Sequence, residues 1–386
     1  MAAAGRDAKL ERLSSALTVR NGELIAAGYF RTAGGVVANR IARHDGISWK
    51  PLGSGMDESV QALTIYNGDL IAGGDFTTAG GQGANFIARW DGASWLPVGT
   101  GMDASVSALT VFNGELVAGG EFITAGGVSA NFIARWDGST WHPLGSGMNH
   151  RVSALAVFNE DLIVGGGFNI AGGVQARRIA RWDGSAWHPL GSGMNGAESF
   201  SVEALAVFNA ELVAGGHFTT VDGQIYAQRL ARWNGTSWRP LGTLPLRVSL
   251  AGVHALTVCD GALIAAGSGF PIVRWDGSAW QALGIGVDGS VSALSVFRGE
   301  LVAGGSFATA GGNVSAHVAR WGSGFPFADW DCDDAVDLAD FVQEHSCLGG
   351  PDEPYAAGCV RGDHDGDQDL DLADLQYFLN GYKPGE

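Results

Sequence analysis

The feature that most constrains this chain is a unit of about 46 residues that occurs seven times between residues 15 and 325. Each copy opens with Ala-Leu-x-Val or a close variant, at Ala16, Ala62, Ala108, Ala154, Ala204, Ala255 and Ala293. Each copy later carries an Arg-aromatic-Asp-Gly-like anchor, at Arg43, Arg89, Arg135, Arg181, Arg232, Arg274 and Arg320.

A repeat of this length made of short strands indicates the blades of a propeller. One small sheet cannot bury both of its faces, so it must stack on its neighbours. The 61 glycines and the low share of charged residues, 16%, agree with many tight turns between short apolar strands. We therefore expect an all-β fold over residues 15–325, a seven-bladed β-propeller of four-stranded antiparallel blades, after an N-terminal segment of residues 1–14.

The third unit shows the expected blade in detail. Its sequence predicts strands over residues 108–112, 115–122, 131–136 and 141–145. Asn113-Gly114 and Asp137-Gly138 predict two-residue hairpin turns between the first and second strands and between the third and fourth.

The same unit resembles kelch repeats. It has a double glycine at Gly119-Gly120, an aromatic-Asp pair at Trp136-Asp137, and a Trp-x-x-Leu that starts at Trp141. The resemblance covers roughly four fifths of the chain and implies a propeller, but it does not identify a function, because one fold hosts many.

Blade geometry sorts the connections into two faces. The tight turns share one face, while the second-to-third loops and the crossovers between blades share the other, which we call the long-loop face; loops of this kind carry most binding sites. The residue after the double glycine varies between copies, as Tyr29, Asp75, Glu121, Gly167, His217 and Ser306. A ligand site would use such variation, so Asp75, Glu121 and His217 are candidate ligand-binding residues.

The last two units are irregular. In the sixth, residues 267–273 lead almost directly into the anchor, and an insert over residues 242–252 precedes it. The seventh lacks Trp-x-x-Leu, so we expect a closing strand from residues 8–13 or 325–327, with the N-terminal segment favoured.

Residues that recur in every blade point to structure rather than chemistry. We expect the anchor arginines to pack over Trp faces and to pair locally with Asp or with backbone carbonyls between blades. The tryptophans that recur should fill the blade cores; they are Trp49, Trp95, Trp141, Trp187, Trp238 and Trp280.

The charge of the chain is concentrated at its C-terminus. The net charge is −17, and from Asp329 onward 16 acidic residues face only Arg361 and Lys383. The body is nearly neutral, so it has no basic patch for nucleic acid. No apolar run is long enough to span a membrane.

Two windows of twelve residues in this tail have matching Asp spacing at loop positions 1, 3, 5, 9 and 12. The positions are Asp329, Asp331, Asp333, Asp337 and Asp340 in the first loop, and Asp363, Asp365, Asp367, Asp371 and Asp374 in the second. Carboxylates so spaced converge on a hard cation, and the carbonyls of Ala335 and Asp369 at position 7 would complete the shell. We expect two Ca²⁺ sites, and a largely unfolded tail without Ca²⁺.

The tail resembles a type I dockerin. Each loop leads into an apolar-periodic helix, over residues 338–347 and 372–381, with no helix before the loop. The resemblance covers most of residues 329–382 and implies a small α-helical domain over residues 329–386. Position 6, normally Gly, is Asp334 in one loop and Gln368 in the other, so we expect weaker calcium binding than in typical dockerins.

Dockerins bind cohesin domains through loop positions 10 and 11, which here are Leu338, Ala339, Leu372 and Ala373. The resemblance therefore implies a cohesin-like or cell-surface partner with an apolar contact surface. The alternative is that these residues pack internally and no such partner exists.

Cysteine usage favours an oxidising compartment, since three of the four cysteines lie in the tail. Cys347 and Cys359 could close a short disulfide loop, although pairings with Cys332 are not excluded. We expect an extracellular or cell-surface protein. Residues 1–15 lack the apolar run of a signal peptide, so we expect the natural start to lie further upstream.

Together these patterns predict a non-catalytic scaffold whose tail docks onto a partner while the propeller face binds a protein or glycan. The alternative is a polysaccharide-active enzyme, because dockerins often carry such catalysts. Glycosidases need two carboxylates across a cleft, and Asp75 with Glu121 is the pair to test.

Overall fold

The computed structural model describes residues 14–196, 201–223, 225–242, 251–269, 272–315 and 317–321. These residues form β-strands joined by turns, as expected for an all-β fold. They contain no helix, and therefore none long and apolar enough to cross a membrane. Both candidate closing segments, both Asp-rich loops, the dockerin-like contact residues, Cys347 and Cys359 lie outside the described residues.

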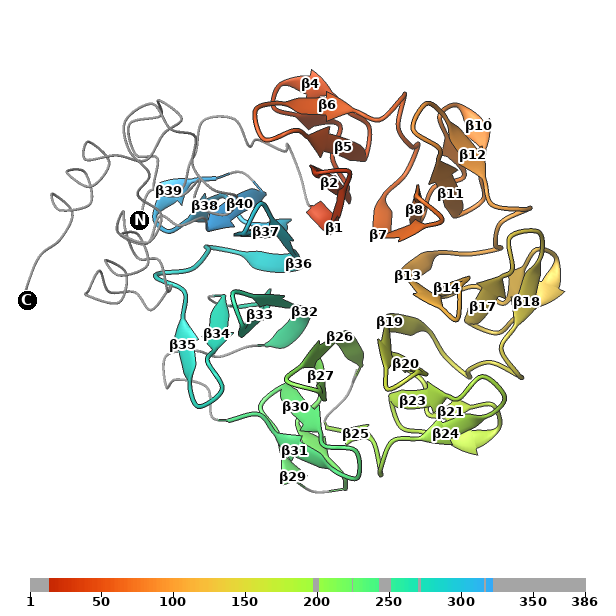
Figure 1. Cartoon of the computed structure of the whole chain (residues 1–386), viewed down its shortest axis with the longest axis vertical. Coiled ribbons are helices and arrows are strands. Elements are labelled where there is room, and N and C mark those ends of the chain that lie inside the picture. Colours follow the sequence, from red (N-terminus) through yellow and green to blue (C-terminus); the bar gives the residue numbers. More distant parts are fainter. Residues whose placement is uncertain are drawn as a thin grey trace, which may run out of the picture. The chain divides into compact units, whose positions relative to one another are not determined.

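The repeats form propeller-like antiparallel sheets (Figure 1). The four-stranded sheets, each given from the first strand to the fourth, are β1 (Ser14–Arg20), β2 (Glu23–Gly28), β5 (Ile41–His44) and β6 (Trp49–Pro51); β7 (Val60–Tyr66), β8 (Asp69–Gly74), β11 (Ile87–Trp90) and β12 (Trp95–Pro97); β13 (Val106–Phe112), β14 (Glu115–Gly120), β17 (Ile133–Trp136) and β18 (Trp141–Pro143); β19 (Val152–Phe158), β20 (Asp161–Gly166), β23 (Ile179–Trp182) and β24 (Trp187–Pro189); β26 (Val202–Phe208), β27 (Glu211–Gly216), β30 (Leu230–Trp233) and β31 (Trp238–Pro240); and β32 (Gly252–Cys259), β33 (Ala262–Ser268), β34 (Val273–Trp275) and β35 (Trp280–Ala282). A further sheet has three described strands, β36 (Ser290–Phe297), β37 (Glu300–Ser306) and β40 (Val318–Trp321).

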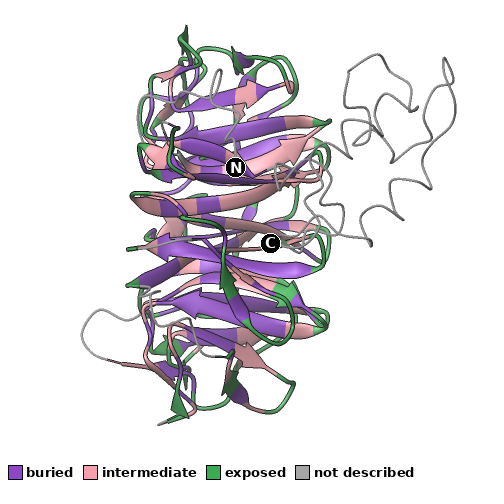
Figure 2. Cartoon of the chain, turned by 90° about the vertical axis from the view of Figure 1, so that its left-hand side faces the viewer, coloured by how far each residue is buried: buried purple, intermediate pink, exposed green. Residues whose placement is uncertain are grey.

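The first strand of every sheet lies innermost. These strands are neighbours around one axis, and β1 lies beside both β7 and β36 (Figure 1). Burial follows the strands: the second strand of each sheet is almost entirely buried, whereas exposed residues gather at the turns (Figure 2). The apolar core is therefore divided into clusters that each combine residues of two adjacent sheets.

Among the described residues, six second-to-third connections hold small hairpins that the sequence did not predict. Each has two-residue strands: β3 (Thr32–Ala33) with β4 (Val36–Val37), β9 (Thr78–Ala79) with β10 (Gln82–Gly83), β15 (Thr124–Ala125) with β16 (Val128–Ser129), β21 (Ile170–Ala171) with β22 (Val174–Gln175), β28 (Thr220–Val221) with β29 (Ile225–Tyr226), and β38 (Thr309–Ala310) with β39 (Asn313–Val314). β25 (Met194–Asn195) joins β28 from the preceding crossover. The turn of the β15–β16 hairpin consists of Gly126 and Gly127, whose φ angles are 61° and 81°. Glycine adopts such positive φ angles without strain, which explains why two glycines stand at this turn.

Crossovers are tied to these hairpins. Asp103 of one crossover accepts hydrogen bonds from the backbone N–H groups of Ile123 and Thr124, both at 2.9 Å. Met102 of the same crossover forms a β-bridge with Ala125. In this part of the long-loop face the hairpin and the crossover are therefore held together by backbone hydrogen bonds.

The recurring tryptophans fill the core as predicted and also join the sheets. Trp141, which is 4% exposed, donates from Nε1 to the carbonyl of Val98 in the preceding sheet at 3.0 Å. The same bond recurs from Trp95, Trp187, Trp238 and Trp280. Each of these five indoles therefore links two neighbouring blades.

Five of the anchor arginines form ion pairs within their own blade rather than between blades, which corrects part of the expectation. Arg135 lies 2.6 Å from Glu115, at the start of the second strand of the same sheet, and both side chains are partly exposed. Equivalent pairs are formed by Arg43, Arg89, Arg181 and Arg232. The second strand lies directly beside the third, so its first residue is the nearest acidic partner.

The third-to-fourth turns predict how stability depends on pH. Asp276 accepts hydrogen bonds from the backbone N–H groups of Ser278 and Ala279, and these bonds lower its pKa from 3.8 to about 2. The pKa of Asp91 is lowered for the same reason. A lowered pKa gives stability that is present above pH 3.8 and is lost as the pH falls toward the folded pKa. We expect the midpoint of unfolding in urea to fall between pH 4 and pH 2.

Asn234 occupies the same turn position in another blade and accepts the same backbone bonds without titrating. The double variant Asp91→Asn and Asp276→Asn should therefore fold normally and lose less stability between pH 4 and pH 2 than the unmodified chain. Tryptophan fluorescence measures both midpoints. Equal acid sensitivity in the two proteins would contradict this account of the turns.

Candidate functional site

Every complete innermost strand begins with a β-bulge at the long-loop face. In β13, Val106 pairs with Gly120 and Ala108 with Gly119, so Ser107 is the extra residue between them. A bulge re-aims the side chain of its extra residue. The extra residues are Ser15, Gln61, Ser107, Ser153, Glu203, His254 and Ser292. The two that can ionise, Glu203 and His254, lie on adjacent strands.

These two residues meet His217, which follows β27 directly. Val202 of β26 pairs with Gly216 of β27, so Glu203 and His217 leave their strands at the same edge of one sheet. Strand β26 lies beside β32, which carries His254. The site therefore joins two blades at the face where the crossovers begin and end.

The three side chains form a compact polar cluster, which we call the Glu-His-His cluster. Glu203 Oε2 lies 2.6 Å from His254 Nδ1 and 3.5 Å from His217 Nε2. The imidazole rings of His217 and His254 meet edge to face with their centroids 5.3 Å apart. The side chains of Glu203, His217 and His254 are 19%, 33% and 30% exposed, so the cluster is open to solvent.

The cluster keeps its carboxylate ionised. Burial raises the pKa of Glu203, but a hydrogen bond from His254, the charge on His254, a hydrogen bond from Ser201 and the charge on His217 together outweigh burial and lower the pKa. Ser201 Oγ donates to Glu203 Oε1 at 2.8 Å. On the far side, His254 Nε2 lies 3.2 Å from Ser268 Oγ.

Gly252 makes room for one of the imidazoles. A Cβ at this position would lie 2.4 Å from His217 Cε1. Equivalent positions in other blades carry a side chain, for example Ser59, Ser105 and Ser290. The glycine is therefore matched to the histidine across the blade junction.

Asp75 directly follows β8 and so occupies the repeat position that His217 occupies after β27. Its side chain is held differently. It accepts hydrogen bonds from Ser59 Oγ at 2.5 Å, from Gln61 Nε2 at 2.8 Å, and from the Ser105 hydroxyl of the next blade. Burial raises its pKa, but these three bonds outweigh burial and lower it. Asp75 is thus a satisfied carboxylate that stays ionised.

Of the three predicted ligand residues, the structure places only His217 in a cluster of chemically active groups. Glu121 is 56% exposed, and Arg151 approaches it at 3.9 Å. Among the described residues no interaction joins Glu121 to Asp75. Catalytic carboxylates flank a cleft without direct contact, so the use of this pair for glycan cleavage stays a prediction.

Glu203 and His254 were not predicted, because they stand at the bulge position and the predicted ligand residues all stand at the position after the double glycine. The signal was nonetheless present in the repeat. The bulge position is Ser in four units and Gln in the second unit, and the two ionisable departures, Glu203 and His254, fall in consecutive units. Comparison of that column as well would have found both residues.

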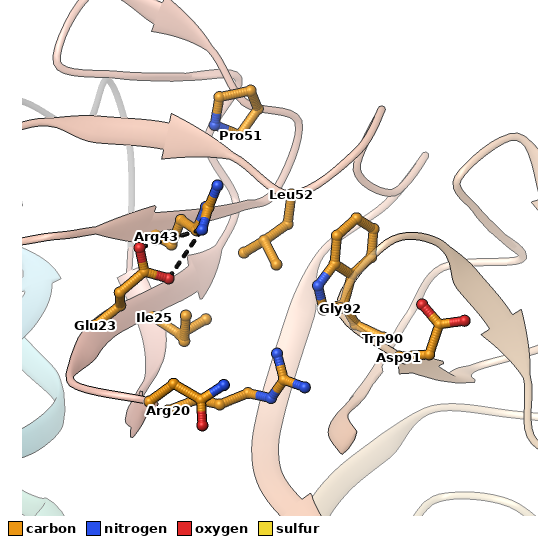
Figure 3. Close-up of a pocket in the computed structure, with 10 residues that line it drawn as sticks. Arg20, Glu23, Ile25, Arg43, Pro51, Leu52, Trp90, Asp91 and Gly92 are labelled. Carbon is orange, nitrogen blue, oxygen red and sulfur yellow. Dashed lines mark hydrogen bonds and ion pairs between the residues drawn. The ribbon is translucent and has the colours of Figure 1, made fainter. Parts of the chain in front are cut away.

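A cavity of about 330 Å³ lies on the opposite face, between the first two sheets (Figure 3). Arg20 and the Glu23–Arg43 ion pair line one side, and Trp90 and Asp91 line the other. The position of Arg20 is Phe in the third to fifth units and in the seventh. The equivalent Phe112 is buried against the neighbouring sheet. In the first unit Arg20 replaces this phenylalanine, and the cavity lies where the aromatic ring would pack.

Arg20 is already partnered in this cavity, since its Nε and Nη2 donate to the carbonyl of Gly68 at 3.0 and 2.8 Å. The charges of Glu23 and Arg43 cancel each other. The cavity therefore offers fewer uncommitted polar groups than the Glu-His-His cluster.

Comparisons with known proteins support the fold. A family model described as a domain of unknown function (DUF5122) beta-propeller matches residues 20–43. No curated protein sequence matches the chain. The crystal structure of the WD40 beta-propeller domain of Doa1 is 14% identical, with a TM-score of 0.53, and the match covers 81% of this chain and 93% of that one.

Two other solved structures are similar. The extracellular domain of the one-component system BT4673 from B. thetaiotaomicron is 9% identical with a TM-score of 0.56, and the match covers 83% of this chain but 40% of that one. The computationally designed Ika8 protein is 16% identical with a TM-score of 0.52, and the match covers 82% of this chain and 99% of the designed one. At these identities the likeness establishes a β-propeller fold and nothing about ligands.

Proposed function

We propose that this chain is a non-catalytic extracellular interaction protein. In this proposal a seven-bladed, kelch-like propeller binds a protein or glycan on its long-loop face near the axis. A dockerin-like tail, ordered by two Ca²⁺ ions, docks onto a cohesin-like or cell-surface partner. The extracellular domain of BT4673 has a similar fold, which is compatible with such a role outside cells.

The observation that carries the proposal is where the blades differ from one another. Their cores repeat the same Trp, Ala and Gly positions, whereas the charged departures Glu203, His217 and His254 gather at one end of the innermost strands. A structural role does not require such departures, because neighbouring blades are stable with Ser at the same positions. Binding to an asymmetric partner does require them.

The state of Asp75 argues against one role in the enzyme alternative, that of the general acid. A glycosidase general acid needs a raised pKa so that it holds a proton at working pH. The pKa of Asp75 is lowered, and three hydrogen bonds already occupy its carboxylate. Asp75 is therefore suited to fixing two blades together rather than to proton transfer.

The test uses substitutions that the repeat itself supplies. Glu203→Ser, His217→Ser and His254→Ser give the cluster the residues of other blades, such as Ser292 and Ser306, so the triple variant should fold. The matched control changes His142 and His188 to Gln, as in Gln281 at the same blade position. His142 lies in β18, on the fourth strand, paired with Asp137.

Each protein is assayed on a glycan array and against isolated cell-surface proteins of the source organism. A ligand of the long-loop face should bind the unmodified chain and the control, and lose at least tenfold in affinity for the triple variant. Ligands that bind all three proteins equally would show that this face is not the binding surface. Cleavage of any arrayed glycan would contradict the non-catalytic assignment.

A further inference from the structure

We propose that Glu203, His217 and His254 bind one Zn²⁺ ion, with at least one coordination position left open toward the long-loop face. The inference goes beyond the proposed function, because it concerns a metal site in the propeller and holds whether or not the tail docks onto a partner. It follows from donor type, from spacing, from supporting hydrogen bonds and from the repeat.

The donor set is one that zinc uses. Imidazole nitrogen and carboxylate oxygen are both zinc ligands, and two histidines with one Glu are a known three-ligand set that keeps a fourth position open. Ca²⁺ and Mg²⁺ prefer oxygen ligands, so two imidazoles argue against them. The cluster is therefore chemically distinct from the Asp-rich loops of the tail.

The spacing is close to what the ion requires. Zinc bonds of about 2.0–2.1 Å in a tetrahedral site place neighbouring donor atoms about 3.3 Å apart. The distance from Glu203 Oε2 to His217 Nε2 is 3.5 Å, and all three donor atoms lie within 4.8 Å of one another. The separation of Glu203 Oε2 and His254 Nδ1, 2.6 Å, must widen by roughly 0.7 Å to reach this geometry. Small rotations of two partly exposed side chains achieve that.

Two of the three ligands, His254 and Glu203, have the supporting contacts that are typical of metal sites. Zinc-bound histidines normally donate from the other ring nitrogen to a fixed acceptor. Ser268 Oγ lies 3.2 Å from His254 Nε2 and can accept that proton, which leaves Nδ1 unprotonated for the metal. Ser201 holds the other oxygen of Glu203 at 2.8 Å. Both ligands also lie at bulges of paired strands, which are rigid positions.

Comparison with the other blades indicates that the Glu-His-His cluster is not needed for the fold. A Glu-His-His hydrogen-bond network could also stabilise the junction, but other blade junctions reach the same fold with Ser at the bulge. Three departures from the repeat, together with Gly252 making room for the His217 ring, converge on one point. Hydrogen bonding alone does not need this set of donors, whereas a metal ion does.

The test is a titration of the full-length chain with Zn²⁺, followed by calorimetry, in millimolar Ca²⁺ so that the Asp-rich loops are saturated. We expect binding that is lost or weakened at least 100-fold in His217→Ser and in His254→Ser. Glu203→Gln keeps the size and hydrogen-bonding capacity of the side chain, and should weaken binding at least tenfold. The control His142→Gln with His188→Gln should bind as the unmodified chain does.

Co²⁺ provides a second readout that separates this site from the tail cysteines. Co²⁺ held by Glu203, His217 and His254 gives visible absorption without the intense near-ultraviolet band of thiolate ligation. Circular dichroism and thermal melting check that each variant is folded, and Ser268→Ala, which removes only a supporting contact, should weaken binding about tenfold. Zinc that binds equally to the unmodified chain and to folded His254→Ser would overturn the proposal, as would no binding at micromolar Zn²⁺ or a thiolate spectrum that persists in His217→Ser.

Discussion

Chelation of Ca²⁺ is expected to abolish the helical circular dichroism of the tail and to leave the propeller signal unchanged. The physical reason is charge: two loops of five aspartates each repel themselves unless a cation neutralises them. The measurement compares spectra and melting curves of the full chain in chelator and in millimolar Ca²⁺. A separate low-temperature transition should appear only when Ca²⁺ is present.

The variants Asp329→Asn and Asp363→Asn remove the first ligand of each loop and should raise the calcium concentration needed for this transition. Asp352→Asn is the matched control, because it removes one acidic charge from the connector and none from a loop. Gln368→Gly should tighten the second site, since glycine adopts the positive φ that position 6 of such a loop requires. Identical spectra in chelator and Ca²⁺ would remove the calcium half of the proposed function.

The second large effect is expected at the indole joints of the propeller. Trp141→Ala should destabilise the propeller by about 3–5 kcal/mol, because it opens a cavity between two sheets and leaves the Val98 carbonyl without its donor. Trp141→Phe keeps most of the volume and isolates the hydrogen bond, which is worth about 1 kcal/mol. Urea unfolding followed by fluorescence measures both changes.

Trp49 is the matched comparison for this joint. It occupies the same repeat position and is equally buried, at 4% exposure, but its Nε1 has no hydrogen-bond partner among the described residues. Trp49→Phe should therefore cost about 1 kcal/mol less than Trp141→Phe. Equal costs would mean that Trp49 does have an acceptor in solution, as a strand completing the β36–β37–β40 sheet would provide.

The fold could be predicted because its information is local and repeated. Asn113-Gly114 and Asp137-Gly138 specify their turns without reference to the rest of the chain, and the period then dictates stacking. The small hairpins were missed because two-residue strands are too short to show alternation. The direction of the Arg135 ion pair was missed because it depends on which strands are neighbours.

The candidate site was only partly predictable for a related reason. His217 was identified because its column varies, but its partners lie 14 residues before it and 37 residues after it in the sequence. Whether Glu203 and His254 meet it depends on the bulges that re-aim them and on the distance between two sheets. Neither quantity can be read from periodicity. Asp75 is a contrasting case, since its position also varies between units but its carboxylate already accepts hydrogen bonds from Ser59, Gln61 and Ser105.

The bond from each indole to the carbonyl behind it also affects how such a chain can change over generations. The second to fifth units carry both halves of the joint, an indole that donates to the preceding unit and a carbonyl that accepts from the next one. A duplicated unit of this kind therefore brings both the donor and the acceptor of the hydrogen bond between blades, and needs no compensating substitutions in its neighbours. Copy number is then limited by the curvature that the stacked sheets can accommodate, while single positions such as Glu203 and His254 are free to diverge.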